Sequence, residues 1–293
     1  MTIDSNDKAL LVSLLYRNEK ERANHIILRQ PIDRQFRDFT WKEAIDQARR
    51  MVTFLHEQGI QRGDRISVLS KNCAEWLITD YACMIGGFIL TPIYATQRDE
   101  DIYYVLKHSE SKLLFVGKLD NWQAQAPGIP EDIITVSFPY DGGMPCDFAW
   151  DQIMQQYSPY PDSPLPKGDD LWSILYTSGT TGSPKGVMYS YEQMADVSHY
   201  GVSDLGVLGL PDDNRLISYL PLAHIAERFG VELVSLGLDE KHFTVYFVES
   251  LETFAEDIQK AHPTIFFAVP RIWTVFQMGI LSKMPKEKLD RLL

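Results

Sequence analysis

The sequence is poor in cysteine, and its three cysteines lie far apart. Cys73, Cys83 and Cys146 form no C-x-x-C pair. A disulfide framework or a zinc site is therefore not expected, and a reducing compartment fits this usage. The seven histidines also lack the H-E-x-x-H spacing of a metalloprotease.

The sequence also lacks a long uninterrupted apolar run. The stretch nearest to membrane-spanning length, residues 76–95, contains Asp80, a Gly-Gly pair and Pro92. A buried helix followed by a buried strand explains it better than a membrane span. The N-terminus has no basic region before an apolar run, so a signal peptide is not expected. We expect a cytoplasmic protein; peripheral association with the inner face of a membrane and the oligomeric state are left open.

Basic residues are in the minority. The chain has 28 Lys and Arg against 40 Asp and Glu, a formal net charge of −12. Such a charge argues against nucleic acid or an anionic membrane surface as a general partner. With 45% hydrophobic and 23% charged residues, the 293-residue chain can bury the core of one large domain or two ordinary ones.

Helix-like and strand-like patterns alternate along the chain. Capping patterns at Thr40, Asn72, Thr96, Ser190 and Ser250 open five of the expected helices. The expected helices cover residues 41–58, 72–85, 96–108, a segment after 190, 223–236 and 250–261. The expected strands cover 64–70, 88–92, 112–116, 133–136, 172–176, 187–189, 215–220, 243–248 and 264–269.

This alternation predicts an α/β fold of mainly parallel sheets sandwiched by helices. Residues 139–170 are rich in Pro, Gly and Asp and read as a loop-dominated link. We therefore expect subdomains at about 1–138 and 171–293.

The most informative stretch runs from Tyr176 to Gly186 and reads YTSGTTGSPKG. Glycines let backbone amides turn toward a ligand, the hydroxyl residues add donors, and Lys185 adds positive charge, a combination that suits a polyphosphate. The spacing is not that of a Walker A loop, because Lys185 follows Gly182 by three residues, behind Pro184. Strand-like flanks predict a loop between two strands. The alternative is an ordinary Ser/Thr/Gly-rich surface turn, which the specific residue order disfavours.

This stretch resembles the phosphate-binding signature of the adenylate-forming (AMP-binding) superfamily, which includes acyl-CoA synthetases, luciferases and peptide-synthetase adenylation domains. Further stretches resemble the family's motifs in the same order: FTWKEA (39–44), ACMIGGFILTPIYAT (82–96), SYLPLAHIAER (218–228) and HPTIFFAVPRIW (262–273). The resemblance covers nearly the whole chain. The last two stretches look most like the long-chain fatty acyl-CoA synthetase branch.

The resemblance implies a role for individual residues. His224 would contact the acyl substrate or gate its channel, although a lone histidine near an apolar helix is more often a core residue. Lys185 would strengthen the positive field at the phosphates, and Arg271 is a candidate phosphate or carboxylate contact or, equally, a surface arginine. Glu227 and Arg228 are weaker candidates that fit an exposed charge pair as well. The residues that would embrace the β- and γ-phosphates are Thr177, Ser178, Gly179, Thr180, Thr181 and Gly182, with Thr177 also a neighbour of Mg²⁺.

The resemblance also implies a reaction. A carboxylate and ATP would give an acyl-adenylate and pyrophosphate, with Mg²⁺ neutralising phosphate charge, and coenzyme A would then take the acyl group as a thioester. The family's adenine-binding and ribose-binding segments and its C-terminal domain with the catalytic lysine do not follow Leu293. We therefore expect an incomplete large N-terminal domain of the acyl-CoA synthetase-like fold, truncated and inactive alone.

Two alternatives to a fatty acid–CoA ligase stay open. One is the adenylation domain of a carboxylic acid reductase or peptide synthetase. The other is a non-catalytic nucleotide-binding or acyl-binding fragment. The acyl chain length is not fixed by the sequence.

Overall fold

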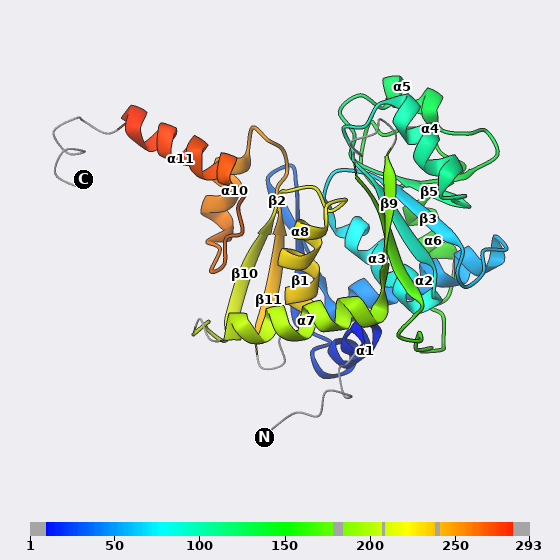
Figure 1. Cartoon of the computed structure of the whole chain (residues 1–293), viewed down its shortest axis with the longest axis horizontal. Helices are drawn as coiled ribbons and strands as arrows, with labels where there is room; N and C mark the ends of the chain where they lie inside the picture. Colours follow the sequence, from blue (N-terminus) through cyan, green and yellow to red (C-terminus); the bar gives the residue numbers. More distant parts are fainter. Residues whose placement is uncertain (1–9, 178–183, 207–208, 238–240, 284–293) are drawn as a thin grey trace.

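The computed structural model describes residues 10–177, 184–206, 209–237 and 241–283, and it forms two sheets with helices packed around them (Figure 1). The smaller sheet has the strand order β10-β11-β1-β2. Its strands are β1 (Ile26–Ile32), β2 (Gln35–Thr40), β10 (Asp213–Ser218) and β11 (His242–Phe247).

The larger sheet has the order β7-β6-β5-β3-β4-β8-β9. Its strands are β3 (Arg65–Leu69), β4 (Ile89–Ile93), β5 (Leu113–Val116), β6 (Ile134–Ser137), β7 (Phe148–Ala149), β8 (Leu171–Thr177) and β9 (Lys185–Ser190). All neighbours in both sheets are parallel except the pairs β1–β2 and β8–β9. The predicted α/β class with mainly parallel sheets is confirmed.

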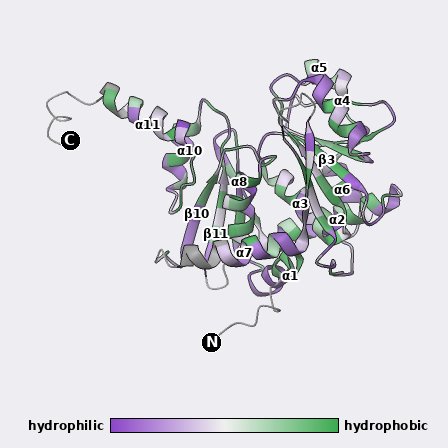
Figure 2. Cartoon of the chain, in the orientation of Figure 1, coloured by the Kyte–Doolittle hydropathy of each residue, from purple (hydrophilic) through white to green (hydrophobic). Residues whose placement is uncertain are grey.

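The helices pack around the two sheets, except for the last one, which extends away from them (Figure 1). They are α1 (Leu11–Glu21), α2 (Trp41–Glu57), α3 (Ala74–Gly86), α4 (Asp99–His108), α5 (Trp122–Gln125), α6 (Trp150–Gln156), α7 (Tyr191–Gly206), α10 (Phe254–Ala261) and α11 (Pro270–Lys283), with a 3₁₀ turn η1 (Ala126–Gly128). A further continuous helical segment consists of α8 (Ile225–Glu227), the π-helical η2 (Arg228–Leu233) and α9 (Val234–Gly237). Hydrophobic residues predominate in this segment, which lies between the two sheets (Figure 2).

Helix α2 forms as its sequence predicts. The Thr40 side chain accepts from the Glu43 amide, and the Glu43 carboxylate accepts from the Thr40 amide at 2.8 Å, which is a complete capping box. The helical period of its sequence places seven apolar residues on one face, and all of them are buried: Trp41, Ala44, Ile45, Ala48, Met51, Val52 and Leu55.

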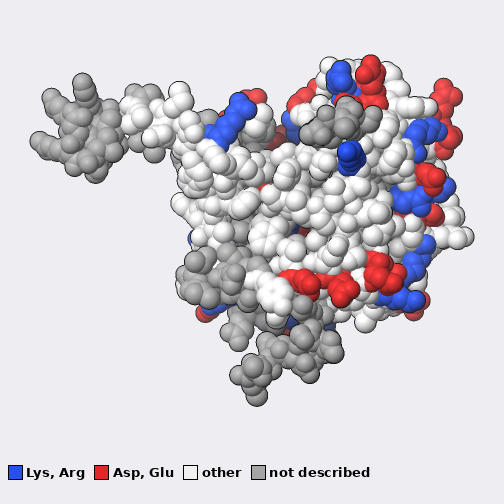
Figure 3. All heavy atoms as spheres, in the orientation of Figure 1, with Lys and Arg blue, Asp and Glu red and all other residues white. Residues whose placement is uncertain are grey.

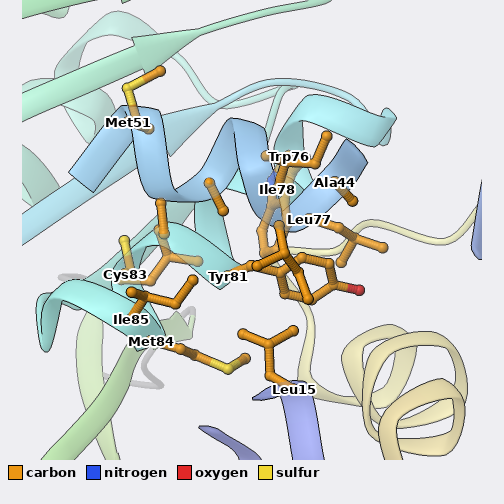
Figure 4. Packing of buried hydrophobic residues seen from close by; sticks show 14 of the residues in the cluster. Leu15, Ala44, Met51, Trp76, Leu77, Ile78, Tyr81, Cys83, Met84 and Ile85 are labelled. Carbon is orange, nitrogen blue, oxygen red and sulfur yellow. The ribbon is translucent and has the colours of Figure 1, made fainter. Parts of the chain in front are cut away.

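The apolar stretch 76–95 folds as a buried helix and a buried strand. Every residue of α3 is buried, and β4 follows it. In Figure 4, Met84 of α3 lies next to Leu15 of α1, within the main core. Among the described residues, no helix is long and apolar enough to cross a membrane.

The predicted caps of α3 and α4 are wrong. Helix α3 begins after Cys73 without a side-chain cap, and the Ala74 amide instead donates to Gln30 Oε1 of β1 at 3.0 Å. Asn72 is therefore free for contacts with the other sheet. Helix α4 begins after Arg98 rather than at Thr96.

The C-terminal described part departs most from prediction. The predicted strand 264–269 makes one isolated parallel bridge, Leu216 with Ile265, and is otherwise not a strand. Helix α10 starts only at Phe254, because Ser250 and Thr253 bond each other in a turn before it. Leu251 is 82% exposed, although the apolar period of the expected helix 250–261 places it on the inward face. The buried residues of α10 are Asp257 and Ala261, and Asp257 is ion-paired with Arg34 at 2.8 Å.

Each sheet takes strands from both sides of residues 139–170. Strand β8 pairs with β4, and β11 pairs with β1. Strand pairing therefore groups the chain differently from the predicted subdomains 1–138 and 171–293. The predicted loop-rich link itself contains β7 and α6.

Candidate active site at the carboxyl ends of the strands

The predicted phosphate loop connects two antiparallel strands. Thr177 at the end of β8 pairs with Lys185 at the start of β9, and both residues are exposed. The prediction of a loop between two strands is confirmed. Because β8 runs parallel to β4, Thr177 lies at the carboxyl edge of the sheet, where ligands of open α/β sheets bind. The other predicted phosphate contacts, Ser178, Gly179, Thr180, Thr181 and Gly182, lie outside the described residues.

The two strands that flank the loop are fixed by side-chain contacts. The hydroxyl of Tyr176 lies 2.7 Å from Nδ1 of His108 in α4, and burial raises the pKa of Tyr176 to about 12. A Cβ on Gly186 would lie 2.9 Å from the Ile174 side chain. Packing against Ile174 therefore explains this last glycine of the signature.

A cavity of about 190 Å³ lies where strands of both sheets end. Its wall combines the residues after β3, β4 and β5 of the larger sheet with those after β10 and β11 of the smaller sheet. The lining residues are Ser70, Lys71, Asn72, Tyr94, Ala95, Thr96, Lys118, Asp120, Ser218, Tyr219, Pro221, Ala223, Val248, Glu249, Ser250 and Leu251. A small molecule bound here would contact both sheets.

His224 follows the cavity wall directly but is not part of it. Its neighbour Ala223 lines the cavity, while His224 is exposed at the N-cap of α8. Its Nδ1 accepts a hydrogen bond from the Ala226 amide at 3.1 Å, which places the ring proton on Nε2. The structure thus gives His224 a capping role; its predicted contact with the acyl substrate stays a prediction.

Glu227 is buried, not exposed. It is 1% exposed and accepts hydrogen bonds from Ser218 Oγ and the Tyr219 amide, each at 2.9 Å. Burial raises the pKa of Glu227 to about 8. Its carboxyl group therefore fixes the segment that forms one wall of the cavity.

Asn72 holds the same segment from the larger sheet. Its Nδ2 donates to the Leu220 carbonyl at 2.6 Å and to Ser218 Oγ at 2.8 Å. Its Oδ1 accepts from the Leu222 amide at 3.0 Å. Sequence reasoning missed this role because the spacing from Asn72 to Glu75 favours a local helix cap. The one sequence signal for a distant contact is a polar amide side chain shortly after the apolar strand β3.

Arg228 is fully buried between aromatic rings. Its guanidinium carbon lies 3.5 Å from the centre of the Trp172 ring and 5.5 Å from that of Trp76. It donates to Asp80, to Glu232 at 3.0 Å and to Ser173 Oγ at 2.8 Å. The expectation of an exposed charge pair at Glu227 and Arg228 is therefore wrong for both residues.

The buried charges around Arg228 are unequal. Two carboxylates, Asp80 and Glu232, face one guanidinium, and all three side chains are 0% exposed. Burial, and secondly the charge of Asp80, raise the pKa of Glu232 well above its usual value. A protonated Glu232 leaves one carboxylate for one guanidinium, which balances the cluster.

Arg271 lies apart from these residues. It is exposed in the first turn of α11, which extends away from the rest of the fold (Figure 1), and it does not line the cavity. Its predicted phosphate or carboxylate contact stays a prediction.

On the face shown in Figure 3, basic and acidic side chains alternate along the right-hand edge and leave the middle largely uncharged.

Comparisons with known proteins agree on one family. The family described as "AMP-binding enzyme" matches residues 15–292. Long chain acyl-CoA synthetase 5 of Arabidopsis thaliana is 29% identical over 272 residues, covering 84% of this chain and 39% of that protein. Fatty acyl-CoA synthetase A of Dictyostelium discoideum is 31% identical over 291 residues, covering 93% of this chain and 43% of that protein. The chain thus spans about two fifths of the length of these relatives.

Solved structures support the same fold at lower sequence identity. The anthranilate CoA ligase AuaEII, in complex with anthranoyl-AMP, superposes with a TM-score of 0.73 at 21% identity, covering 89% of this chain and 49% of that chain. A benzoate CoA ligase from Burkholderia xenovorans LB400 gives a TM-score of 0.74 at 15% identity, covering 90% and 50%. At these identities the likeness establishes the fold and leaves the substrate open.

Proposed function

The chain belongs to the AMP-binding enzyme family, and we propose that it forms the phosphate-binding part of a ligase that activates a long-chain fatty acid. In the first step the fatty acid carboxylate attacks the α-phosphorus of ATP, giving an acyl-adenylate and pyrophosphate. In the second step coenzyme A displaces AMP and forms the acyl-CoA thioester.

The observation that carries this proposal is the position of the β8–β9 hairpin. It holds Thr177 and Lys185 as a cross-strand pair at the carboxyl edge of the parallel strands. An ammonium and a hydroxyl at this edge suit a polyphosphate, which needs positive charge and donors held in place. The long-chain fatty acid is inferred from the names of the relatives.

Each predicted site residue has a role in this proposal. Thr177 and the loop residues Ser178, Gly179, Thr180, Thr181 and Gly182 would bind the β- and γ-phosphates, and Lys185 would offset their charge. His224 would lie at the acyl side, with its ring held by the Ala226 amide. Arg271 would contact a phosphate or a carboxylate from the start of α11.

Mg²⁺ fits this arrangement as an ion carried by the nucleotide. The described residues contain no cluster of three or more His, Cys, Asp or Glu that could hold a metal. Magnesium at nucleotide sites keeps several waters and takes only one or two protein oxygens beside the phosphates. The Thr177 hydroxyl would supply one such oxygen, and the bound ion would neutralise phosphate charge.

Calorimetric titration of the chain with ATP and Mg²⁺ tests the phosphate site. We expect saturable binding that Lys185→Ala weakens by roughly tenfold or more, because a charge-assisted hydrogen bond contributes about 1.5–3 kcal/mol. Lys20→Ala, an exposed lysine of α1, is the matched control. Undetectable ATP binding, or equal losses in both variants, would contradict the proposed site.

The reaction itself is tested by measuring pyrophosphate release from a longer protein that contains this chain and matches the full length of the relatives. Palmitate should give turnover with ATP and Mg²⁺, and benzoate or an amino acid should not. Turnover with an amino acid instead would favour the adenylation domain of a peptide synthetase. ATP binding with no pyrophosphate from any acid would favour a non-catalytic nucleotide-binding module. Peripheral membrane association stays a prediction that these assays do not address.

A further inference from the structure

Lys118 lies at a crevice where the strand order of the larger sheet reverses. Strand β3 is followed in the chain by β4 on one side and later by β5 on its other side. The carboxyl ends of β3 and β5 therefore open a crevice of the kind that binds ligands in α/β folds. Two cavities of about 400 and 190 Å³ meet there. Both are lined by Lys71, Lys118, Asp120, Glu249 and Ser250.

The two lysines of this shared wall differ in their partners. The ammonium of Lys71 is paired with the Asp120 carboxylate. The Nζ of Lys118 donates to the backbone carbonyl of Glu249 at 2.9 Å and lies 5.6 Å from the centre of the Tyr140 ring. In the described part of the chain, no ion pair within 4.0 Å involves Lys118. A carbonyl accepts from a neutral amine as well as from an ammonium, so Lys118 keeps its hydrogen bond when it loses its charge.

The surroundings of Lys118 favour that neutral form. Burial is the main cause that lowers the pKa of Lys118 from its ordinary value. The charged and titratable groups that face it are Cys73 and Glu75 at α3, Lys71 after β3, Tyr140 after β6 and Glu249 after β11. The Glu249 carboxylate is ion-paired with Arg34 at 3.0 Å. Because Arg34 offsets its negative charge, Glu249 stabilises the charged form of Lys118 less.

We propose that Lys118 is an acylation site that accepts the acyl group of a carboxylic–phosphoric mixed anhydride entering this crevice. The neutral Nζ attacks the carbonyl carbon and forms a C–N bond. The C–O bond to the phosphate breaks, the phosphate leaves with the bonding electron pair, and the proton on nitrogen passes to water. The apolar residues Tyr94, Val248 and Leu251 of the smaller cavity suit an acyl chain. An acyl-adenylate, the intermediate of the proposed function, is one mixed anhydride of this class.

Acetyl phosphate, a small mixed anhydride, tests the proposal on the chain itself. The folded chain is treated over a series of pH values, and the acetylation rate of each lysine is measured by mass spectrometry after cleavage at glutamate. We expect Lys118 to react faster than Lys71 near neutral pH, because burial lowers the pKa of Lys118 and so raises its neutral fraction. In concentrated urea this difference should vanish, because it depends on the fold. An equal or lower rate at Lys118 in the folded chain would overturn the proposal, as would a ratio unchanged by urea.

Two variants and a second acyl donor sharpen the test. Lys118→Arg keeps a long basic side chain but removes the primary amine, and it should abolish the fast site while other lysines react as before. Asp120→Asn frees Lys71 from its ion pair and should raise its rate without changing that of Lys118. Acetyl-CoA as donor distinguishes thioesters from mixed anhydrides, and faster labelling by acetyl-CoA than by acetyl phosphate would contradict the donor class proposed here.

The outcome is separable from that of the proposed function. ATP binding is measured by calorimetry on the same chain without any substitution at Lys118. Fast acetylation of Lys118 without ATP binding would overturn the proposed function alone. ATP binding with an unreactive Lys118 would overturn this inference alone.

Discussion

Glu227 and Arg228 are neighbours in the sequence, yet their side chains bind to opposite sheets. Glu227 accepts from Ser218 at the end of β10, whereas Arg228 donates to Ser173 within β8. Ser173 lies four residues before Thr177, on the strand that leads into the predicted phosphate loop. The helical segment that follows His224 is therefore tied both to the cavity wall and to the strand of the phosphate loop.

Glu227→Gln should make stability less dependent on pH. The carboxyl pKa is raised from 4.5 to about 8, so the folded state holds a proton that the unfolded state releases as the pH rises through this window. The free energy of unfolding is then highest below the unfolded pKa and falls by up to about 1.4 kcal/mol per pH unit until the folded pKa is passed. Gln keeps the acceptor for Ser218 and cannot ionise.

Urea denaturation between about pH 4.5 and 8 measures how the free energy of unfolding depends on pH in wild type and in Glu227→Gln. Glu57→Gln, at an exposed residue of α2, is the control. Equal slopes for wild type and Glu227→Gln would refute this.

Arg228→Met should destabilise the chain strongly. The substitution leaves the buried carboxyl groups of Asp80 and Glu232 without their cation, and breaking a buried pair in this way costs about 3–5 kcal/mol. Adding Asp80→Asn to Arg228→Met should recover part of the loss, since it removes the uncompensated charge. Urea denaturation gives both values. A loss near zero, or a double variant less stable than the single one, would show that the cluster is not held by charge.

Asn72→Ala should loosen the cavity wall. It removes hydrogen bonds to Leu220, Ser218 and Leu222, at a cost of about 1–3 kcal/mol for the buried groups left unpaired. Hydrogen exchange should accelerate at the Leu222 amide, which loses its acceptor. Asn121→Ala, at the exposed N-cap of α5, is the matched control and should leave that amide unchanged. Unaltered exchange at Leu222 in Asn72→Ala would argue against the bridge.

Gly186→Ala should destabilise the hairpin by packing rather than by loss of a ligand contact. The added methyl group meets Ile174 at 2.9 Å, and forcing it in costs about 1–3 kcal/mol. Ile174→Ala removes the methyl group that Cβ would strike, so the double variant should lose less than the sum of the two single variants. Thermal denaturation of the four proteins measures this coupling. Strict additivity would mean that the two side chains do not collide.

The parts of the fold that sequence predicts well are those set by local contacts. The capping box at Thr40 and the apolar period behind it determine α2 within one segment, and the Gly-rich loop between strand-like flanks is likewise local. Asn72 shows the limit, because its local capping pattern competes with partners almost 150 residues away and loses.

The remaining misses have the same long-range origin. Strand β1 is not among the predicted strands. Its parallel neighbour β11 lies more than 200 residues later in the chain, so no local pattern indicates this pairing. Residues 264–269 have a strand-like composition, but only Ile265 pairs with a neighbouring strand, through a single bridge to Leu216. The burial of Glu227 and Arg228 likewise follows from two sheets closing on one helical segment, which no pattern within that segment reveals.

The strand order β10-β11-β1-β2 also has a consequence for folding during synthesis, because β1 and β2 precede their neighbour β11 by about 200 residues. The hairpin of β1 and β2 leaves the ribosome early, but its parallel neighbour β11 ends only at Phe247. A hairpin of two strands is marginally stable alone, so the apolar side chains of Ile27 and Leu28 stay exposed to water until β11 has been made. Nascent chains that contain β1 and β2 but end before Phe247 are therefore the ones we expect chaperones to bind.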